Sequence, residues 1–268
     1  MSQRRQPDTE VIAERLGSVL LVTLQGDATR NALGPGVYEQ ILALILQAEA
    51  DSQIGSLVLA GAGRFFSSGG NVRALRDSAK GTLSQATGNT DRLNRLIRSI
   101  VACRKPVIAA VEGGAAGAGF SLVLACDLVV ASDTASFSAA HVRVGLSPDG
   151  GATYFLRAAL PRQLVMEICM LGQPVSAARL AAAGVVNRVV AEGTALRAAL
   201  ALAQELADGP PGAIATIKHL INAAPGSDLP GHLEAEAEAL NLARFGPEAS
   251  EGLTAFLEKR PPRFRDAT

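Results

Sequence analysis

Two glycine-rich segments of the chain could bind a negatively charged atom through backbone N–H groups. The first, Gly61–Gly70, directly follows an apolar run and ends in the pair Gly69-Gly70. The second, Val111–Gly119, contains only glycine and alanine after Glu112. Glycine lets a loop adopt unusual backbone angles and lets a ligand approach closely, and the start of a helix presents unpaired N–H groups. Each segment taken alone is equally consistent with an ordinary turn or a tightly packed helix end.

Asp149 is the main candidate for a side chain that moves a proton. It lies in Ser147–Gly151, where Pro-Asp-Gly is also the ordinary composition of a turn. A carboxylate presented just before a helix can act as a general base. His141, a short distance upstream, could be a base, a substrate contact or a hydrogen-bonded core histidine. The sequence alone leaves these three interpretations open.

Other kinds of site find no support in the sequence. Neither GxGxxG nor GxxxxGK[ST] occurs, so dinucleotide-binding and phosphate-loop patterns are absent. The three histidines lack acidic partners at metal-ligand spacing, so no metal site is expected. The three cysteines form no CxxC pair, which indicates neither a zinc site nor a disulfide framework. This cysteine usage fits a reducing compartment, and we expect a cytoplasmic protein.

Strands that alternate with helices must position these segments. Apolar runs bounded by turn residues predict strands that are buried on both faces. These runs are Ser18–Leu24, Ser56–Ala60, Pro106–Val111 and Leu128–Ala131. The helices expected between them are Val37–Ala48, Leu93–Val101 and the small-residue stretch Gly113–Cys126. The first half of the chain is therefore expected to form an α/β domain.

Beyond Asp149 the chain becomes mainly helical. Only Val185–Val190 has the pattern of a strand in this half. The expected helices cover residues 161–171, 176–183, 194–208, 211–222, 231–244 and 247–258. We therefore predict three parts, which are a flexible N-terminal tail over residues 1–10, a core domain over 11–192 and a C-terminal helical region over 193–268.

Composition excludes several classes of protein. The 268 residues include 25 basic and 25 acidic side chains, no tryptophan and only 4% aromatic residues. Nucleic-acid binding needs a basic excess and stacking aromatics, so a general nucleic-acid binder is not expected. The most apolar stretch, Gly113–Cys126, is shorter than the roughly 20 residues that a membrane span needs. A chain with 48% hydrophobic residues can bury a large core without disulfides.

Five segments form an ordered set of motifs along the chain. They are Arg30–Leu33 (NAL), Phe66–Val72 (F-[CAS]-[AS]-G-x-D-[LI]), Pro106–Gly119 (KPVIAAVxGxAxGxG), Cys126–Leu128 (CDL) and Glu251–Arg260 (EGxxAFxEKRxPxF). Together they resemble the crotonase superfamily, the enoyl-CoA hydratases and isomerases, over residues 12–265. The resemblance implies a crotonase-like α/β fold, which is a spiral of ββα units of the ClpP/crotonase kind. It also implies C-terminal helices that assemble subunits into trimers or dimers of trimers.

The resemblance implies chemistry on an acyl-CoA thioester. Members of the superfamily place the thioester carbonyl oxygen between two backbone N–H groups, which stabilise an enolate. The matching donors here are Gly70 and Ala118. Glycine is commoner at the second position, but a backbone donor does not depend on its side chain. Asp149 lies in Gly145–Gly151, which is similar to the segment of enoyl-CoA isomerases in which a carboxylate shuttles a proton.

The resemblance also assigns contacts with the substrate. The loop with Phe66 and Ser68 is expected to hold the adenine end of coenzyme A, and Phe256 and Lys259 to reach the coenzyme A of a neighbouring subunit. The basic stretch Lys259–Arg265 is expected to lie near its phosphates. Further expected substrate contacts are Arg30, Ala32, Asn71, Val72, Ser121 and His141. No separate cofactor is implied, because coenzyme A is part of the substrate.

The side chains around the thioester decide which reaction occurs. The two glutamates of true hydratases correspond here to Ser121 and His141, so hydration by two glutamates is not expected. Isomerisation of a double bond or of a ring epoxide, with Asp149 as the proton shuttle, is favoured instead. The enzymatic alternatives are a hydratase with a different site and a hydrolase or lyase. The non-enzymatic alternative is a catalytically inactive acyl-CoA-binding or RNA-binding relative, against which zero net charge and the presence of Asp149 argue.

Overall fold

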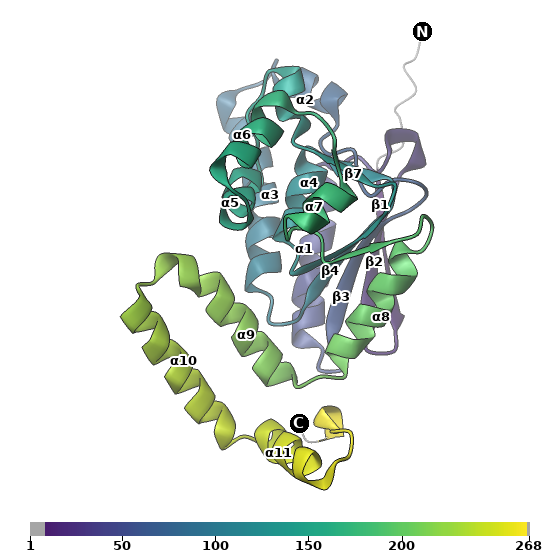
Figure 1. Ribbon diagram of the computed structural model, residues 1–268. Coiled ribbons are helices and arrows are strands. Elements are labelled where there is room, and N and C mark those ends of the chain that lie inside the picture. Colours follow the sequence, from purple (N-terminus) through teal and green to yellow (C-terminus); the bar gives the residue numbers. More distant parts are fainter. Residues whose placement is uncertain (1–8, 267–268) are drawn as a thin grey trace.

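The computed structural model describes residues 9–266, which form two β-sheets with helices around them and a C-terminal helical arm (Figure 1). The strands are β1 (Glu10–Leu16), β2 (Val19–Gln25), β3 (Ser56–Gly61), β4 (Val107–Val111), β5 (Gly114–Ala116), β6 (Leu128–Ser132), β7 (Ser136–Ser138), β8 (Val175–Ser176) and β9 (Arg188–Val190). The helices are α1 (Pro35–Ala50), α2 (Val72–Ser78), α3 (Leu83–Ala102), α4 (Ala118–Ala125), α5 (Ala152–Ala159), α6 (Arg162–Leu171), α7 (Ala177–Ala182), α8 (Ala195–Ala207), α9 (Pro211–Ala223), α10 (Leu229–Arg244) and α11 (Pro247–Glu258).

The larger sheet forms the body of the domain. Its strand order is β1-β2-β3-β4-β6-β9, with β1 antiparallel to β2 and the other neighbours parallel. Alternate side chains of β3 face opposite sides of the sheet. Leu57 and Leu59 pack into the cluster that includes α1 and α3, whereas Val58 and Ala60 pack with α8. Both faces are therefore buried, as the uninterrupted apolar runs of the sequence predict.

The chain passes repeatedly between the larger sheet and the smaller one. β4 and β6 belong to the larger sheet, and β5 and β7, which follow them, belong to the three-stranded sheet β5-β7-β8. A helix comes after each of these strand pairs, α4 after β5 and α5 after β7. This repetition of strand, strand and helix is a crotonase-like spiral of ββα units, so the predicted fold class is confirmed.

Several short elements differ from the sequence-based expectation. Glu10, which we placed in the flexible tail, is the first residue of β1. This edge strand is mostly exposed, and its sequence lacks the uninterrupted apolar run by which the other strands were predicted. Residues 1–8 of the predicted tail lie outside the described residues. Gly113–Cys126 is not one helix, because β5 precedes α4 and Gly117 turns the chain between them at φ +52°. β7 and β8 are too short to show a periodicity. The polar stretch before Leu93, for which the sequence predicted no helix, forms α2 and the first turns of α3.

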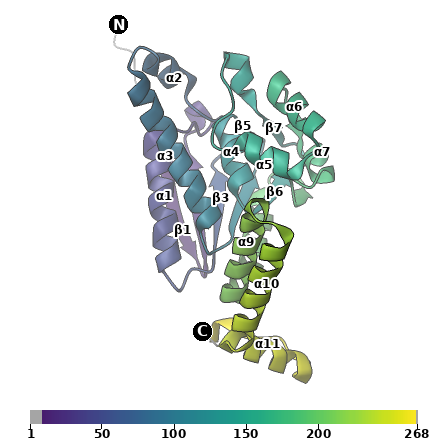
Figure 2. The same cartoon turned by 90° about the vertical axis from the view of Figure 1, so that its left-hand side faces the viewer.

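The C-terminal region divides into a part that belongs to the body and an arm. α8, which we placed with the C-terminal helices, packs on β3 and β4 through Ala195, Ala199 and Ala203, so the body extends to the end of α8. The arm consists of α9, α10 and α11 and projects away from the sheets in both views (Figures 1 and 2). Across residues 9–266, no helix combines the length and apolar character needed to cross a bilayer.

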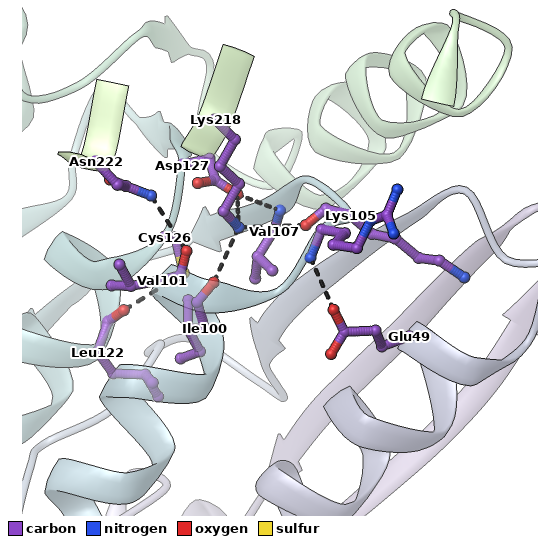
Figure 3. A network of polar contacts seen from close by, with 11 residues as sticks. Glu49, Ile100, Val101, Lys105, Val107, Leu122, Cys126, Asp127, Lys218 and Asn222 are labelled. Carbon is purple, nitrogen blue, oxygen red and sulfur yellow. Dashed lines mark hydrogen bonds and ion pairs between the residues drawn. The ribbon is translucent and has the colours of Figure 1, made fainter. Parts of the chain in front are cut away.

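A polar network around Lys218 fastens α9 to the body (Figure 3). The Lys218 Nζ donates to Asp127 Oδ2 at 2.7 Å and to two backbone carbonyl groups. The same Asp127 oxygen accepts the N–H of Val107 at 2.7 Å, and Asn222 donates to the carbonyl of Val101 at 3.1 Å. Burial raises the pKa of Asp127, and the charge of Lys218 acts in the opposite direction. Asp127 is therefore a structural residue that accepts a backbone N–H group and the Lys218 ammonium group.

Replacing Lys218 by methionine should destabilise the protein. Methionine keeps the apolar stem but leaves Asp127 partly buried without its counter-ion, which costs about 3 kcal/mol in comparable pairs. Asn222→Ala, at the same junction, removes one hydrogen bond and should cost about 1 kcal/mol. Urea unfolding followed by circular dichroism measures both variants. Equal losses would show that the ion pair is not the principal fastening of α9.

Candidate active site

The two glycine-rich segments meet beyond the carboxyl ends of β3 and β4. Ser67 and Ala115 form a parallel bridge, and the N–H of Ala116 donates to the carbonyl of Ser67 at 3.0 Å. On the other side of the same loop, the N–H of Leu33 donates to the carbonyl of Gly69 at 2.8 Å. Backbone hydrogen bonds from both sides therefore hold the loop after β3 against the turn that leads into α4.

Gly69 is the point at which the two segments approach most closely. Its φ is +83°, and an added Cβ would lie 2.4 Å from the carbonyl oxygen of Ala116 and 3.1 Å from the nitrogen of Ala118. The N–H groups of Gly70 and Ala118 have no hydrogen-bond partner in residues 9–266. Ala118 is the first residue of α4, where no acceptor within the helix is available. Two unpaired donors on adjoining segments can hold a carbonyl oxygen that gains negative charge.

Asn31 and Ser67 fix the loop, and the sequence reasoning missed both. Asn31 is fully buried, and its amide donates to the carbonyl groups of Ala62 and Phe65 at 2.9 and 2.7 Å. The Ser67 hydroxyl donates to the carbonyl of Asn31 at 2.7 Å and accepts the N–H of Gly69 at 3.1 Å. Asn31 lies inside the NAL motif, but its role depends on partners far away in the sequence.

A hollow of about 340 Å³ lies beside these segments, and both Gly70 and Asp149 line it. Its walls come from the loop before α1 and from α1, α2 and α3. The apolar lining includes Leu33, Val37, Ala74, Leu75 and Leu93, and the polar lining includes Tyr38, Gln40, Asn71, Ser78, Asn89 and Thr90. Asp149 is the only charged side chain among the described lining residues. Nowhere in the described part of the chain do three His, Cys, Asp or Glu side chains gather as a metal site would require.

His141 and Ser121 position Asp149 at the edge of the hollow. Asp149 Oδ1 lies 3.1 Å from His141 Nε2, and the Ser121 hydroxyl donates to the backbone carbonyl of Asp149 at 2.9 Å. The side chain of Asp149 is 37% exposed and that of His141 only 10%, so the carboxylate reaches the open space and the imidazole lies behind it. His141 Nδ1 is buried without a partner, and a proton there would lose about 1–3 kcal/mol of hydrogen bonding. The ring nitrogen that bonds to the carboxylate is therefore Nε2, and a ring proton is better placed there than at Nδ1.

Residues 14–267 match a family model described as enoyl-CoA hydratase/isomerase. The chain belongs to this family. A 1,2-epoxyphenylacetyl-CoA isomerase of Escherichia coli is 34% identical over 92% of this chain and 94% of its own length. A 2,3-dehydroadipyl-CoA hydratase of Escherichia coli is also 34% identical, over 96% of this chain and 99% of its own. A crystal structure of an enoyl-CoA hydratase from Polaromonas sp. JS666 has a TM-score of 0.93 at 41% identity, and the match covers 94% of this chain and 98% of that one. The family is thus confirmed, and its members carry the names of both reactions.

The hollow of this enoyl-CoA hydratase/isomerase family member collects only part of the predicted site. Gly70, Ala32, Asn71 and Asp149 line it. The Asn71 side chain also accepts the first N–H groups of α2, which makes it a helix cap as well. The structure places Ser121 and His141 behind Asp149 rather than in the lining, so their contacts are with the candidate base. These are the positions that the resemblance equates with the two glutamates of hydratases, and here both side chains contribute to positioning one aspartate.

Four other predicted contacts support the loop or lie outside the hollow. Phe66 is only 1% exposed and packs in the core, so its side chain is not available to a substrate, and the expectation that its loop holds the adenine end stays a prediction. The Ser68 hydroxyl donates to the carbonyl of Thr29 at 2.8 Å, which braces the loop. The Arg30 guanidinium lies 5.9 Å from the centre of the Phe65 ring, on the exposed side of the same loop. Val72 is exposed at the start of α2 and is not part of the lining.

The C-terminal residues expected to contact coenzyme A lie far from the hollow of their own chain. Phe256 and Lys259 are on and just after α11, at the opposite end of the molecule from α2 (Figure 1). One residue of the basic stretch forms an ion pair within the chain. Arg260 Nη1 and Nη2 donate to the Glu251 carboxylate at 2.7 and 2.9 Å. These hydrogen bonds, with that from the N–H of Arg263, lower the pKa of Glu251 to about 2. The expectation that Phe256 and Lys259 contact the coenzyme A of a neighbouring subunit stays a prediction.

Gly69→Ala should destabilise the protein more than Gly184→Ala. Both glycines have φ +83°, so alanine at either position pays about 1–2 kcal/mol of backbone strain. Only at Gly69 does the new Cβ overlap a backbone oxygen, whereas nothing lies within 4 Å of it at Gly184. The overlap should add about 1–3 kcal/mol. Urea unfolding of the two variants checks the difference, and equal losses would contradict the close contact between the two segments.

Proposed function

We propose that this protein is an acyl-CoA isomerase that works through an enolate. The thioester carbonyl oxygen lies between the N–H groups of Gly70 and Ala118. Asp149 removes a proton from the carbon next to the carbonyl and returns it to another carbon of the acyl group. The double bond, or the bonds of a ring epoxide, rearrange while the atoms of the substrate are conserved. The observation that carries this proposal is that Gly70 and Asp149 line one hollow, in which Asp149 is the only charged side chain among the described residues.

The surroundings of Asp149 fit a proton carrier. A base that takes a proton and gives it back must remain in one place through both steps, and the bonds from His141 and Ser121 supply that constraint. The contact with His141 also orients the carboxylate toward the open space of the hollow, where the substrate proton would lie. The two donors of the oxyanion site then stabilise the enolate, and each such donor typically contributes about 2.7–4 kcal/mol.

Hydration is the second candidate, because relatives with hydratase names are as similar to this chain as the isomerase. Hydration requires that one water be activated and held, and that a proton be delivered to the substrate. In the described hollow one carboxylate would have to perform all of these tasks. Isomerisation needs only the movement of one proton, which a single carboxylate can perform, and this is why we favour it.

Asp149→Asn should abolish most of the activity. The amide cannot remove a proton, and loss of a general base typically lowers the rate about 10²- to 10⁴-fold. Exchange of the proton next to the thioester of a bound acyl-CoA with deuterium from solvent, followed by mass spectrometry, measures this step directly. Asp133→Asn, at an exposed turn between β6 and β7, is the matched control and should exchange like the wild type. Exchange that persists in the Asp149 variant would contradict its role as the base.

A panel of CoA esters separates isomerisation from hydration. Saturated, 2-enoyl, 3-enoyl and ring-epoxide esters would be incubated with the enzyme, and changes of mass and absorbance would be recorded. An isomerase converts a 3-enoyl ester without a change of mass, whereas a hydratase adds the mass of water to a 2-enoyl ester. Rapid hydration of crotonyl-CoA with no conversion of the 3-enoyl ester would contradict the proposed reaction.

We also propose that the arm joins subunits into a trimer or a dimer of trimers. Large apolar side chains are exposed along α9, α10 and α11. They are Ile217, Ile221, Leu229, Leu233, Leu240, Leu242, Phe245, Leu253, Phe256 and Leu257. Exposed apolar side chains in this number are typical of a surface that another protein covers. Such an assembly would also bring Phe256 and Lys259 to the site of a neighbouring subunit.

Charged residues on α11 should therefore dissociate the assembly. Phe256→Glu combined with Leu257→Glu places two carboxylates on the exposed apolar surface, and we expect a monomer in sedimentation velocity at micromolar concentration. Leu46→Glu, on the exposed face of α1, is the control and should leave the assembly intact. A wild-type protein that sediments as a monomer would contradict the proposal.

A further inference from the structure

Tyr38 is a polar group in the hollow that the proposed mechanism does not use. It belongs to the first turn of α1, its side chain is 7% exposed, and it lines the same hollow as Gly70 and Asp149. Its hydroxyl makes no hydrogen bond to any group of residues 9–266, and it is not among the side-chain atoms there that are fully enclosed without a partner. The hydroxyl therefore faces the open space of the hollow. Because a buried tyrosine hydroxyl normally has a partner, the missing partner is expected to come from a ligand.

Tyr38 also acts as a hydrogen-bond donor at this position. Burial raises the pKa of Tyr38, and the nearby charge of Asp149 raises it further, so the phenol keeps its proton at neutral pH. Tyr38 and Asp149 line the same hollow, so a ligand atom that meets Tyr38 occupies the space into which the Asp149 carboxylate opens.

Three other polar side chains on this wall already donate hydrogen bonds to backbone carbonyl groups. Gln40 donates to the carbonyl of Gly36, Ser78 to that of Leu75 and Thr90 to that of Thr87. Each of these hydrogen bonds lies within one helix, and it leaves the side chain less free to bind a ligand. Tyr38 is the hydroxyl among the described lining residues that remains available on α1.

The charge of the hollow limits the ligand atom that Tyr38 can meet. No lysine, arginine or histidine is among the described lining residues, so an acyl group that ends in a carboxylate would face Asp149 without a counter-ion. A plain hydrocarbon would leave the Tyr38 hydroxyl without a partner. A neutral oxygen avoids both penalties.

We propose that Tyr38 makes this site selective for acyl-CoA esters whose acyl group carries a neutral oxygen, such as a hydroxyl, carbonyl or ring-ether oxygen, which accepts a hydrogen bond from the tyrosine. The inference rests on the proposed function, because that function places the acyl group in the hollow. Tyr38 is here a specificity-determining residue, and the proton transfer remains the task of Asp149.

Binding of saturated esters tests this selectivity without any need for turnover. Isothermal titration calorimetry would compare hexanoyl-CoA with its 3-, 4-, 5- and 6-hydroxy derivatives. At least one hydroxy ester should bind the wild type about three- to tenfold more tightly than hexanoyl-CoA, which is the range of one neutral hydrogen bond. Tyr38→Phe should remove that preference and leave the affinity for hexanoyl-CoA unchanged. Tyr154→Phe is the matched control, because Tyr154 is 59% exposed on α5 and lies outside the lining, and it should bind like the wild type.

Three results would overturn the inference. They are the absence of any preference for a hydroxy ester in the wild type, a preference that survives in Tyr38→Phe, and an equal loss of affinity for all esters in that variant. Failure of the proposed reaction would be recognised separately. If Asp149→Asn retained exchange while the Tyr38-dependent preference persisted, the reaction assignment would fail and the selectivity would stand. If no CoA ester bound at all, both would fail.

Discussion

The contact between the backbone of Gly69 and that of the turn before α4 is the constraint on which the site depends. It brings two loops from neighbouring parallel strands so close that not even a methyl group fits between them. Every other feature of the loop supports this contact, including the buried amide of Asn31 and the hydroxyl of Ser67. The two unpaired N–H groups of Gly70 and Ala118 exist as neighbours only because the loops are held in this way. The strands position the two loops, and Gly69 allows the loops to approach because it has no Cβ.

Two neighbouring side chains hold Asp149 in place. Ser121 and His141 stand at the positions that the resemblance equates with the two glutamates of hydratases. Here they bond to the backbone carbonyl and the carboxylate of Asp149. They therefore position one carboxylate instead of adding two. Because Asp149 is the only charged side chain among the described lining residues, a reaction that moves one proton is the simpler interpretation.

The sequence predicted the features that local pattern determines. β2, β3, β4 and β6 were predicted because both of their faces are apolar. The helices from α6 onward were predicted because their segments are rich in Ala, Leu, Arg and Glu, whereas α5 was missed. β1, β5, β7 and β8 were missed because they are polar or very short and depend on pairing with distant strands. Phe66 was predicted as a substrate contact because it lies in a motif loop, but that loop pairs with β5, and its apolar side chain is drawn into the core. Tyr38 gave no local signal, since a tyrosine in a helix is usually a core residue, and only the fold shows that it lines the same hollow as Asp149.

Helix α4 joins two parts of the molecule that serve different purposes. Its first residue, Ala118, supplies one of the two unpaired donors, and Asp127, just beyond its last turn, is the anchor of the arm. Eight helical residues span only about 12 Å, and a short helix of fully hydrogen-bonded turns hardly bends or stretches over such a length. A displacement of the arm that moves Asp127 should therefore also move Ala118, because the helix between them is rigid. In the proposed assembly, subunit contacts made by the arm would therefore act on one of the two proposed oxyanion donors through α4.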